Sequence, residues 1–357
     1  MEKLLAPILA FFIALLITPA VRKLAFAWGA VDLPNPRKVH QHVMPRLGGL
    51  AIYVAFVIPL LLTMPVGPVF GLVTGVSLIV LIGVIDDIKG LSPWVKLGGQ
   101  ILAAYSLILF NIQIGFVTNP FNGHSIVLGW WGIPITIFWV VAVTNAINLI
   151  DGLDGLAGGV SCIAALTIAA VGWTQWKFFG VAGQQEIIML AIILAAAIVG
   201  FLRHNIYPAS IFLGDTGSML LGFTLSAVSV LGLTKSATAV SVFIPLVILG
   251  IPLFDVLLAV FRRYHLRKPI FQADREHIHH KLMSLGFNHR QTVAVIYGIS
   301  FLLGVSAVVL NMVTSDQAMV LLVILAGLVI ILSGKIGLFS VSKRTSRTAS
   351  RSSSQHL

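Results

Sequence analysis

Four stretches of this chain place carboxylates, amides or histidines at the ends of long apolar runs. They contain Asp86 and Asp87; Asn145, Asn148, Asp151 and Asp154; Asp215 in a Gly-Asp-Thr-Gly turn; and His277, His279 and His280. Ionisable side chains are costly in lipid, so such groups beside apolar runs point to a functional site. Taken singly, each stretch is also explained by a hydrated loop or, at Asp215, by a helix N-cap.

The side-chain types favour phosphate chemistry with a hard metal ion. Carboxylate and amide oxygens suit Mg²⁺, and the single cysteine, Cys162, lies away from these stretches in an apolar run. The histidines stand near Arg275, and imidazole with guanidinium groups would contact a phosphate or diphosphate. On a helix, His277 and His280 would share one face and His279 would point away.

Two further features bear on such a site. Because adjacent carboxylates point in different directions, at most one of Asp86 and Asp87 is expected to face a given ligand, while the other serves as a base or an outer-shell partner. The Pro45-Arg-Leu-Gly-Gly49 turn could bind phosphate, although a solvated basic loop explains its charge equally well. His289 is expected to be an exposed residue outside the site.

Composition indicates a polytopic membrane protein. Hydrophobic residues make up 58% of the 357 residues and charged residues 10%, against roughly 25% charged in soluble domains. The net charge of +11 is expected to reflect topology and anionic lipid, so no nucleic-acid partner is predicted. We expect one membrane domain over residues 1–341 and a disordered basic tail over 342–357, which has almost nothing apolar to bury.

About eleven apolar runs predict an all-α fold, since a membrane-spanning helix needs roughly 20 residues. They fall at 4–20, 48–64, 68–85, 96–115, 131–149, 155–174, 186–202, 216–233, 238–261, 291–311 and 318–337. Two prolines and a glycine at 64–68 separate the second run from the third. The first run is expected to stay as an uncleaved helix, because its basic residues follow it rather than precede it.

The basic residues gather on one side of the membrane if the odd-numbered runs point inward. Of the 23 lysines and arginines, only Lys3, Lys177 and Lys235 then lie elsewhere. The positive-inside rule places that side, with the long loop 262–290 and the C-terminus, in the cytoplasm and the N-terminus outside. Most carboxylates share this face, and since carboxylates contribute little to orientation, we expect a site there.

The positions of the acidic residues also bear on two alternative functions, an ion-coupled transporter and an intramembrane aspartyl protease. An ion-coupled transporter would carry its carboxylates near mid-span, and only Asp255 approaches such a position. An intramembrane aspartyl protease would need a Gly-x-Gly-Asp pattern, which fails because residue 212 is Phe212. The transporter is retained as an alternative.

Together the motifs resemble the polyprenyl-phosphate N-acetylhexosamine-1-phosphate transferases, the family of the MraY, WecA and TagO enzymes. The resemblance covers nearly the whole chain and rests on Asp86-Asp87, Asn145 to Gly155, Phe212-Leu-Gly-Asp-Thr-Gly-Ser and His277-Ile-His-His280. MraY-type members usually carry three consecutive histidines and a Pro-Thr-Met-Gly-Gly turn. The departures here favour a TagO-like enzyme that uses UDP-GlcNAc over one that uses UDP-MurNAc-pentapeptide.

The resemblance implies transfer of GlcNAc-1-phosphate from UDP-GlcNAc to undecaprenyl phosphate with release of UMP, an early step of surface glycan synthesis such as that of teichoic acid. It implies a multi-pass protein of the bacterial plasma membrane and allows a homodimer. It assigns Mg²⁺, with Mn²⁺ as an alternative, to Asp215 and Asn148, and gives Asp86 or Asp87 a role at the lipid phosphate. It assigns diphosphate contacts to Lys96, His277, His279 and His280, and nucleoside contacts to Asp151 and Asp154. Arg275, which stands near the histidines, is expected to bind substrate phosphate with them.

Overall fold

The computed structural model describes residues 2–33, 42–64, 66–119, 124–234, 242–265 and 277–336. Its helices are α1 (Glu2–Ala27), α2 (Gly48–Thr63), α3 (Val66–Lys89), α4 (Pro93–Leu109), η1 (Gly129–Trp131), α5 (Gly132–Ile150), α6 (Leu156–Phe179), α7 (Gln184–Asn205), α8 (Gly214–Thr234), α9 (Phe243–Ile248), α10 (Gly250–His265), α11 (Ile278–Ser284), α12 (His289–Met312) and α13 (Ser315–Ile336). Two small antiparallel hairpins pair β1 (Val31–Asp32) with β2 (Met44–Pro45) and β3 (Phe116–Thr118) with β4 (Ser125–Val127).

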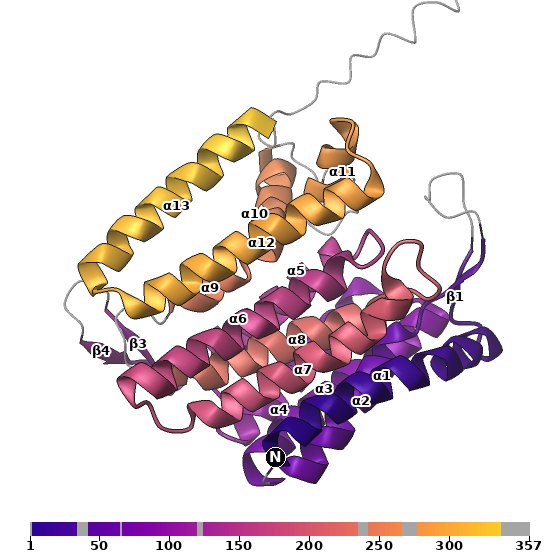
Figure 1. Ribbon diagram of the computed structural model, residues 1–357, viewed down its shortest axis with the longest axis horizontal. Coiled ribbons are helices and arrows are strands. Elements are labelled where there is room, and N and C mark those ends of the chain that lie inside the picture. Colours follow the sequence, from indigo (N-terminus) through magenta and orange to yellow (C-terminus); the bar gives the residue numbers. More distant parts are fainter. Residues whose placement is uncertain are drawn as a thin grey trace, which may run out of the picture.

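Long apolar helices dominate the fold, as expected for a polytopic membrane protein. Within the described ranges, seven helices are long and apolar enough to cross a membrane, and two shorter apolar helices accompany them. In such an environment a helix satisfies its own backbone hydrogen bonds, so the apolar runs fold as helices rather than open strands. The predicted all-α class is therefore confirmed, with the hairpins confined to the two ends of the bundle (Figure 1).

One prediction about the last third of the chain is wrong. The run at 238–261 is not one helix, because its described part divides at Leu249 into α9 and α10. Pro252 supplies the reason, since it has no N–H to donate to the carbonyl of Ile248. The loop expected at 262–290 is in part helical: α10 continues to His265, and α11 lies between it and α12.

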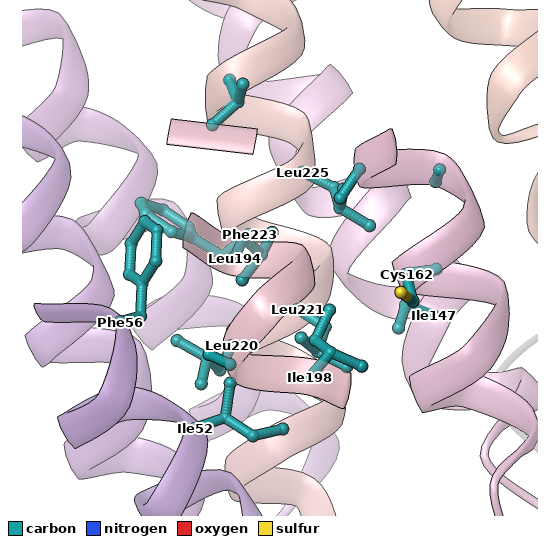
Figure 2. Close-up of a cluster of buried hydrophobic side chains, with 14 of the residues drawn as sticks. Ile52, Phe56, Ile147, Cys162, Leu194, Ile198, Leu220, Leu221, Phe223 and Leu225 are labelled. Atoms are coloured by element: carbon teal, nitrogen blue, oxygen red, sulfur yellow. The ribbon is translucent and has the colours of Figure 1, made fainter. Parts of the chain in front are cut away.

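The centre of the bundle is α8, which packs against α2, α3, α5, α6 and α7. Figure 2 shows its side chains Leu220, Leu221, Phe223 and Leu225 among apolar residues of α2, α5, α6 and α7. Phe223 is fully buried. Because the middle of α8 is enclosed on several sides, the position of its amino end is fixed by the helices around it.

Glycines allow two helices to approach the amino end of α8 closely. A Cβ atom on Gly49 of α2 would lie within 2.2 Å of the backbone of Gly217, and one on Gly83 of α3 within 2.4 Å of the Cα atom of Thr216. Separations under about 3 Å are too short for a carbon contact, so neither position accepts a side chain. The carboxyl end of α3 and the first turn of α8 are thereby brought together.

Candidate active site

A pocket of about 700 Å³ opens at the end of the bundle where α3, α5 and α7 finish and α6 and α8 begin. Residues from segments far apart in the sequence line it: Asp32, His42, Met44, Arg46, Asp87, Asn148, Asp151, Gly152, Leu153, Asp154, Asn205, Tyr207, Pro208, Ala209, Phe212, Leu213, Gly214, Asp215, His280 and His289. This is the end that carries β1 and α11 in Figure 1, opposite the β3–β4 hairpin. The predicted gathering of the polar stretches at one end is therefore observed.

Asp215 lies in the first turn of α8, at the point where three helices meet. Its Oδ2 atom is 2.6 Å from the Lys96 ammonium of α4, and its Oδ1 atom accepts a hydrogen bond of 2.7 Å from the Asn148 amide of α5. The same amide donates to the Ser218 hydroxyl at 2.8 Å. The Asp215 side chain is still 31% exposed, so it remains accessible from the pocket.

Asp86 and Asp87 point in different directions, as adjacent residues on a helix should. Asp86 turns to α4, where its carboxylate is 2.6 Å from the Lys96 ammonium and accepts the Leu91 N–H at 2.6 Å. Asp87 turns to α8 and accepts the Asp215 N–H at 3.0 Å, the Thr216 N–H at 2.9 Å and the Thr216 hydroxyl at 2.6 Å. Asp87 therefore caps the amino end of α8, whose first N–H groups have no partner within the helix.

Behind Asn148, a pair of side-chain amides, one buried and one half-buried, joins α4 to α5. Asn145 donates to the Gln100 side-chain oxygen at 2.7 Å, and Gln100 is only 2% exposed. Gln100 is one turn from Lys96 on α4, and Asn145 is about one turn from Asn148 on α5. The hydrogen bond between Gln100 and Asn145 therefore sets the distance between the Lys96 ammonium and the Asn148 amide, which both hold Asp215. The motifs did not point to Gln100, because it lies inside an apolar run.

Asp151 and Asp154 lie on the turn between α5 and α6 and line the pocket. Asp154 accepts the Ala209 N–H at 3.0 Å. Asp151 makes no side-chain hydrogen bond or ion pair with another residue of the described ranges. Burial, together with the negative charges of Asp215, Asp87 and Asp154, raises the pKa of Asp151 well above its ordinary value. A cation in the pocket would oppose that shift and favour the ionised carboxylate.

The histidines are not arranged as predicted. His277 precedes α11 with an extended backbone, so helical spacing does not apply to it. Its ring stacks with that of His279 at a centroid distance of 5.9 Å, whereas His280 is exposed and lines the pocket. The expectation that His277 and His280 share a face with His279 turned away is therefore wrong. Burial and the neighbouring imidazoles of His280 and His277 lower the pKa of His279 to about 3, so His279 is neutral at pH 7.

His289 was expected to lie outside the site, and that expectation is wrong. It lines the pocket, and its ring lies 4.4 Å from that of Tyr207 between centroids, while the Arg290 guanidinium stands 5.6 Å from the centre of the same Tyr207 ring. Asn205, also missed, links the α6 turn to the loop before α8 by accepting the Gly155 N–H and donating to the Ile211 carbonyl. The contacts of His289 with Tyr207 and of Asn205 with Gly155 join residues that are far apart in the sequence, so no local sequence pattern predicts them. Arg275 lies outside the described residues.

The charge of the pocket decides what it can bind. Its described lining contains the carboxylates of Asp32, Asp87, Asp151, Asp154 and Asp215, against one arginine, Arg46. A diphosphate would be repelled from this surface unless a multivalent cation accompanied it. Within the described ranges, no three His, Cys, Asp or Glu side chains form a metal cluster. The partly exposed Asp215 carboxylate fits Mg²⁺, which is usually bound through one or two protein groups together with substrate phosphates and water. Asn148 turns its amide nitrogen to Asp215 and Ser218, so it would offer its oxygen to the ion once that amide is turned over.

Comparisons with known proteins agree on one family. A model described as glycosyl transferase family 4 matches residues 69–233. A probable undecaprenyl-phosphate N-acetylglucosaminyl 1-phosphate transferase of Bacillus subtilis is 40% identical over 319 residues, covering 88% of this chain and 87% of its own. A decaprenyl-phosphate N-acetylglucosaminephosphotransferase of Mycobacterium tuberculosis is 34% identical, over 83% of this chain and 79% of its own.

A third relative has a similar name. The undecaprenyl-phosphate alpha-N-acetylglucosaminyl 1-phosphate transferase of Escherichia coli K12 is 32% identical over 77% of this chain and 75% of its own. The resemblance drawn from the motifs is thereby confirmed. With relatives that are 32–40% identical over 77–88% of the chain, and with the motif residues gathered around one pocket, the chain belongs to glycosyl transferase family 4, among the polyprenyl-phosphate N-acetylglucosamine-1-phosphate transferases.

Proposed function

We propose that this protein transfers GlcNAc-1-phosphate from UDP-GlcNAc to undecaprenyl phosphate. A phosphate oxygen of the lipid attacks the sugar-bearing phosphorus of UDP-GlcNAc, and the bond from that phosphorus to the bridging oxygen breaks. The products are undecaprenyl-diphospho-GlcNAc and UMP. The names of the relatives support the acceptor class and the sugar.

The observation that carries the proposal is the acidic pocket built around Asp215. Both substrates are anionic, and the described lining carries more carboxylates than basic side chains, so we expect a divalent cation to accompany them. Asp215 and Asn148 would hold Mg²⁺, or Mn²⁺ in its place. Such an ion would supply positive charge that offsets the diphosphate and the charge that develops during phosphoryl transfer.

The protein's own residues divide the remaining tasks. Lys96, paired with Asp86 and Asp215, neutralises the carboxylates and keeps Asp215 oriented. Asp87 acts by holding the first turn of α8 rather than as a base, since its oxygens already accept hydrogen bonds from that turn. A phosphate monoester is largely ionised at neutral pH, so the lipid nucleophile needs little help from a base.

Two groups of residues in the pocket lining suit the two ends of the nucleotide sugar. His280 is exposed to the pocket and would contact a diphosphate, whereas His279, which is 3% exposed and absent from the described lining, would support the His280 ring from behind. Asp151 and Asp154 stand on the turn proposed for the nucleoside, with the Tyr207 ring nearby to offer an aromatic face. Arg275, outside the described residues, is proposed as a further diphosphate contact.

The proposed setting is the bacterial plasma membrane with the pocket facing the cytoplasm, where UDP-sugars are made. The distribution of lysine and arginine supports this orientation, with about eleven spanning helices, the N-terminus outside and the C-terminus inside. Residues 1–341 form one catalytic domain in this proposal, and the basic tail 342–357 lies outside the described residues. A homodimer remains compatible with this arrangement.

The deciding experiment supplies the purified protein with Mg²⁺, undecaprenyl phosphate and either UDP-GlcNAc or UDP-MurNAc-pentapeptide, and measures UMP. We expect UMP with UDP-GlcNAc and background release with the pentapeptide substrate. The reverse preference would identify an MraY-like enzyme. Background release with both donors would refute the transferase proposal, and ion-coupled uptake in proteoliposomes would then favour the transporter alternative.

A further inference from the structure

A carboxylate outside the pocket, Asp255 on α10, holds the amino end of α11. Asp255 is 1% exposed. Its Oδ2 atom lies 2.8 Å from Nδ1 of His277, and its Oδ1 atom accepts the Ile278 N–H at 2.9 Å. A buried carboxylate needs hydrogen bonds to offset its lost hydration, so these two contacts tie α11 firmly to α10.

A chain of contacts leads from Asp255 to the pocket. Next to a carboxylate, Nδ1 of His277 is assigned as the N–H donor, which fixes the ring orientation. That ring is stacked on His279, with an angle of 5° between the planes. His279 in turn lies against Gly152, where a Cβ atom would come within 2.4 Å of the His279 Nε2 atom. His279 thus contacts the turn that carries Asp151 and Asp154.

His280 completes the path, because its ring is 4.2 Å from that of His279 between centroids and it lines the pocket. Asp255 and His277 are both absent from the described pocket lining, and His277 is 6% exposed. Neither residue is therefore placed to touch a substrate directly. Their contacts instead determine where the two following histidines stand.

We propose that Asp255 is a positioning residue of this site: through His277 and the amino end of α11 it holds His279 and His280 against the Gly152 turn. This inference rests on the proposed function where turnover is measured, whereas the measurement of UDP binding does not depend on that function. It also changes the role of His277, which becomes the link to Asp255 rather than a diphosphate contact. The partner that the structure gives Asp255, His277, lies 22 residues away along the chain.

The test is a double-mutant cycle of Asp255→Asn and His279→Ala, measured on the full-length protein. Asp255→Asn keeps the side-chain shape but removes the charge that holds the His277 N–H. Misplacement by about 1 Å can lower turnover by roughly 100-fold, so we expect each single variant to lose about 10- to 100-fold in kcat/KM for UDP-GlcNAc. The kcat/KM of the double variant should be no lower than that of the less active single variant, because both changes disrupt the same chain of contacts.

A binding measurement separates failure of this inference from failure of the proposed function. The dissociation constants of UDP in the presence of Mg²⁺ should show the same non-additive pattern even if no UMP is released. If the losses of the two single variants multiply in the double variant, or if Asp255→Asn has wild-type kcat/KM and UDP affinity, the positioning role is overturned. Asn311→Ala serves as the matched control, because Asn311 is a buried polar residue bonded to Gln175 and Thr174 away from the pocket; it should lower stability and leave UDP affinity unchanged.

His277→Asn keeps the inference testable if Asp255→Asn does not fold. The Asn side-chain amide can place an N–H near the position of Nδ1, so Asp255 keeps its partner. We expect kcat/KM and UDP affinity to stay within about threefold of wild type. A loss of tenfold or more in both would mean that the ring itself, and not its bond to Asp255, is required, and the inference would fail.

Discussion

Replacing Asp87 with alanine distinguishes a residue that builds the site from one that performs chemistry in it. The substitution removes the acceptor of the Asp215 N–H, the Thr216 N–H and the Thr216 hydroxyl. Thr216 is fully buried, so at least two donors lose their partner away from bulk water. Each unsatisfied buried donor costs about 1–3 kcal/mol, and we expect Asp87→Ala to lower the free energy of unfolding by about 3–5 kcal/mol.

Thermal unfolding of the detergent-purified protein, followed by tryptophan fluorescence, measures this effect. Asp154→Ala is the control, because Asp154 also lines the pocket but accepts a single described backbone N–H, and it should cost about 1 kcal/mol. Asp87→Asn keeps one acceptor oxygen and should fall between wild type and Asp87→Ala in both stability and turnover. An Asp87→Asn protein with wild-type stability and no turnover would refute the capping argument and identify Asp87 as a direct participant.

Two further predictions concern Asp215 and His279. Asp215→Ala should abolish Mg²⁺-dependent UMP release while the protein stays folded by circular dichroism, and normal turnover would remove Asp215 from the site. The pKa of His279 is lowered from 6.5 to about 3, so the unfolded chain binds the extra proton and stability falls as pH drops from about 6.5 toward 3. Between pH 7.5 and pH 5 the loss is about 2 kcal/mol; a His279→Gln protein with the same acid sensitivity as wild type would contradict this.

The sequence could predict that the polar stretches meet, because each stands at the end of an apolar run and successive helices alternate direction. Alternation alone brings Asp87, Asn148 and Asp215 to one end of the bundle, and the observed pocket contains all three. Family membership followed from the same motifs, since residue types and their order along the chain are properties of the sequence. These conclusions needed no knowledge of which helices touch.

The tertiary structure alone decided what each side chain at that end does. Whether Asp86 or Asp87 reaches α8 depends on how α3 is rotated against it, which is set by the contact of Gly83 with Thr216. The division of α9 from α10 and the start of α11 placed His277 on Asp255 instead of in the pocket. Apolar periodicity and hydropathy are local properties of the sequence, and they determine where the helices form. The rotation of each helix and the contacts between residues more than 20 positions apart depend on how the helices pack. The roles of the side chains within the site therefore became visible only in the folded protein.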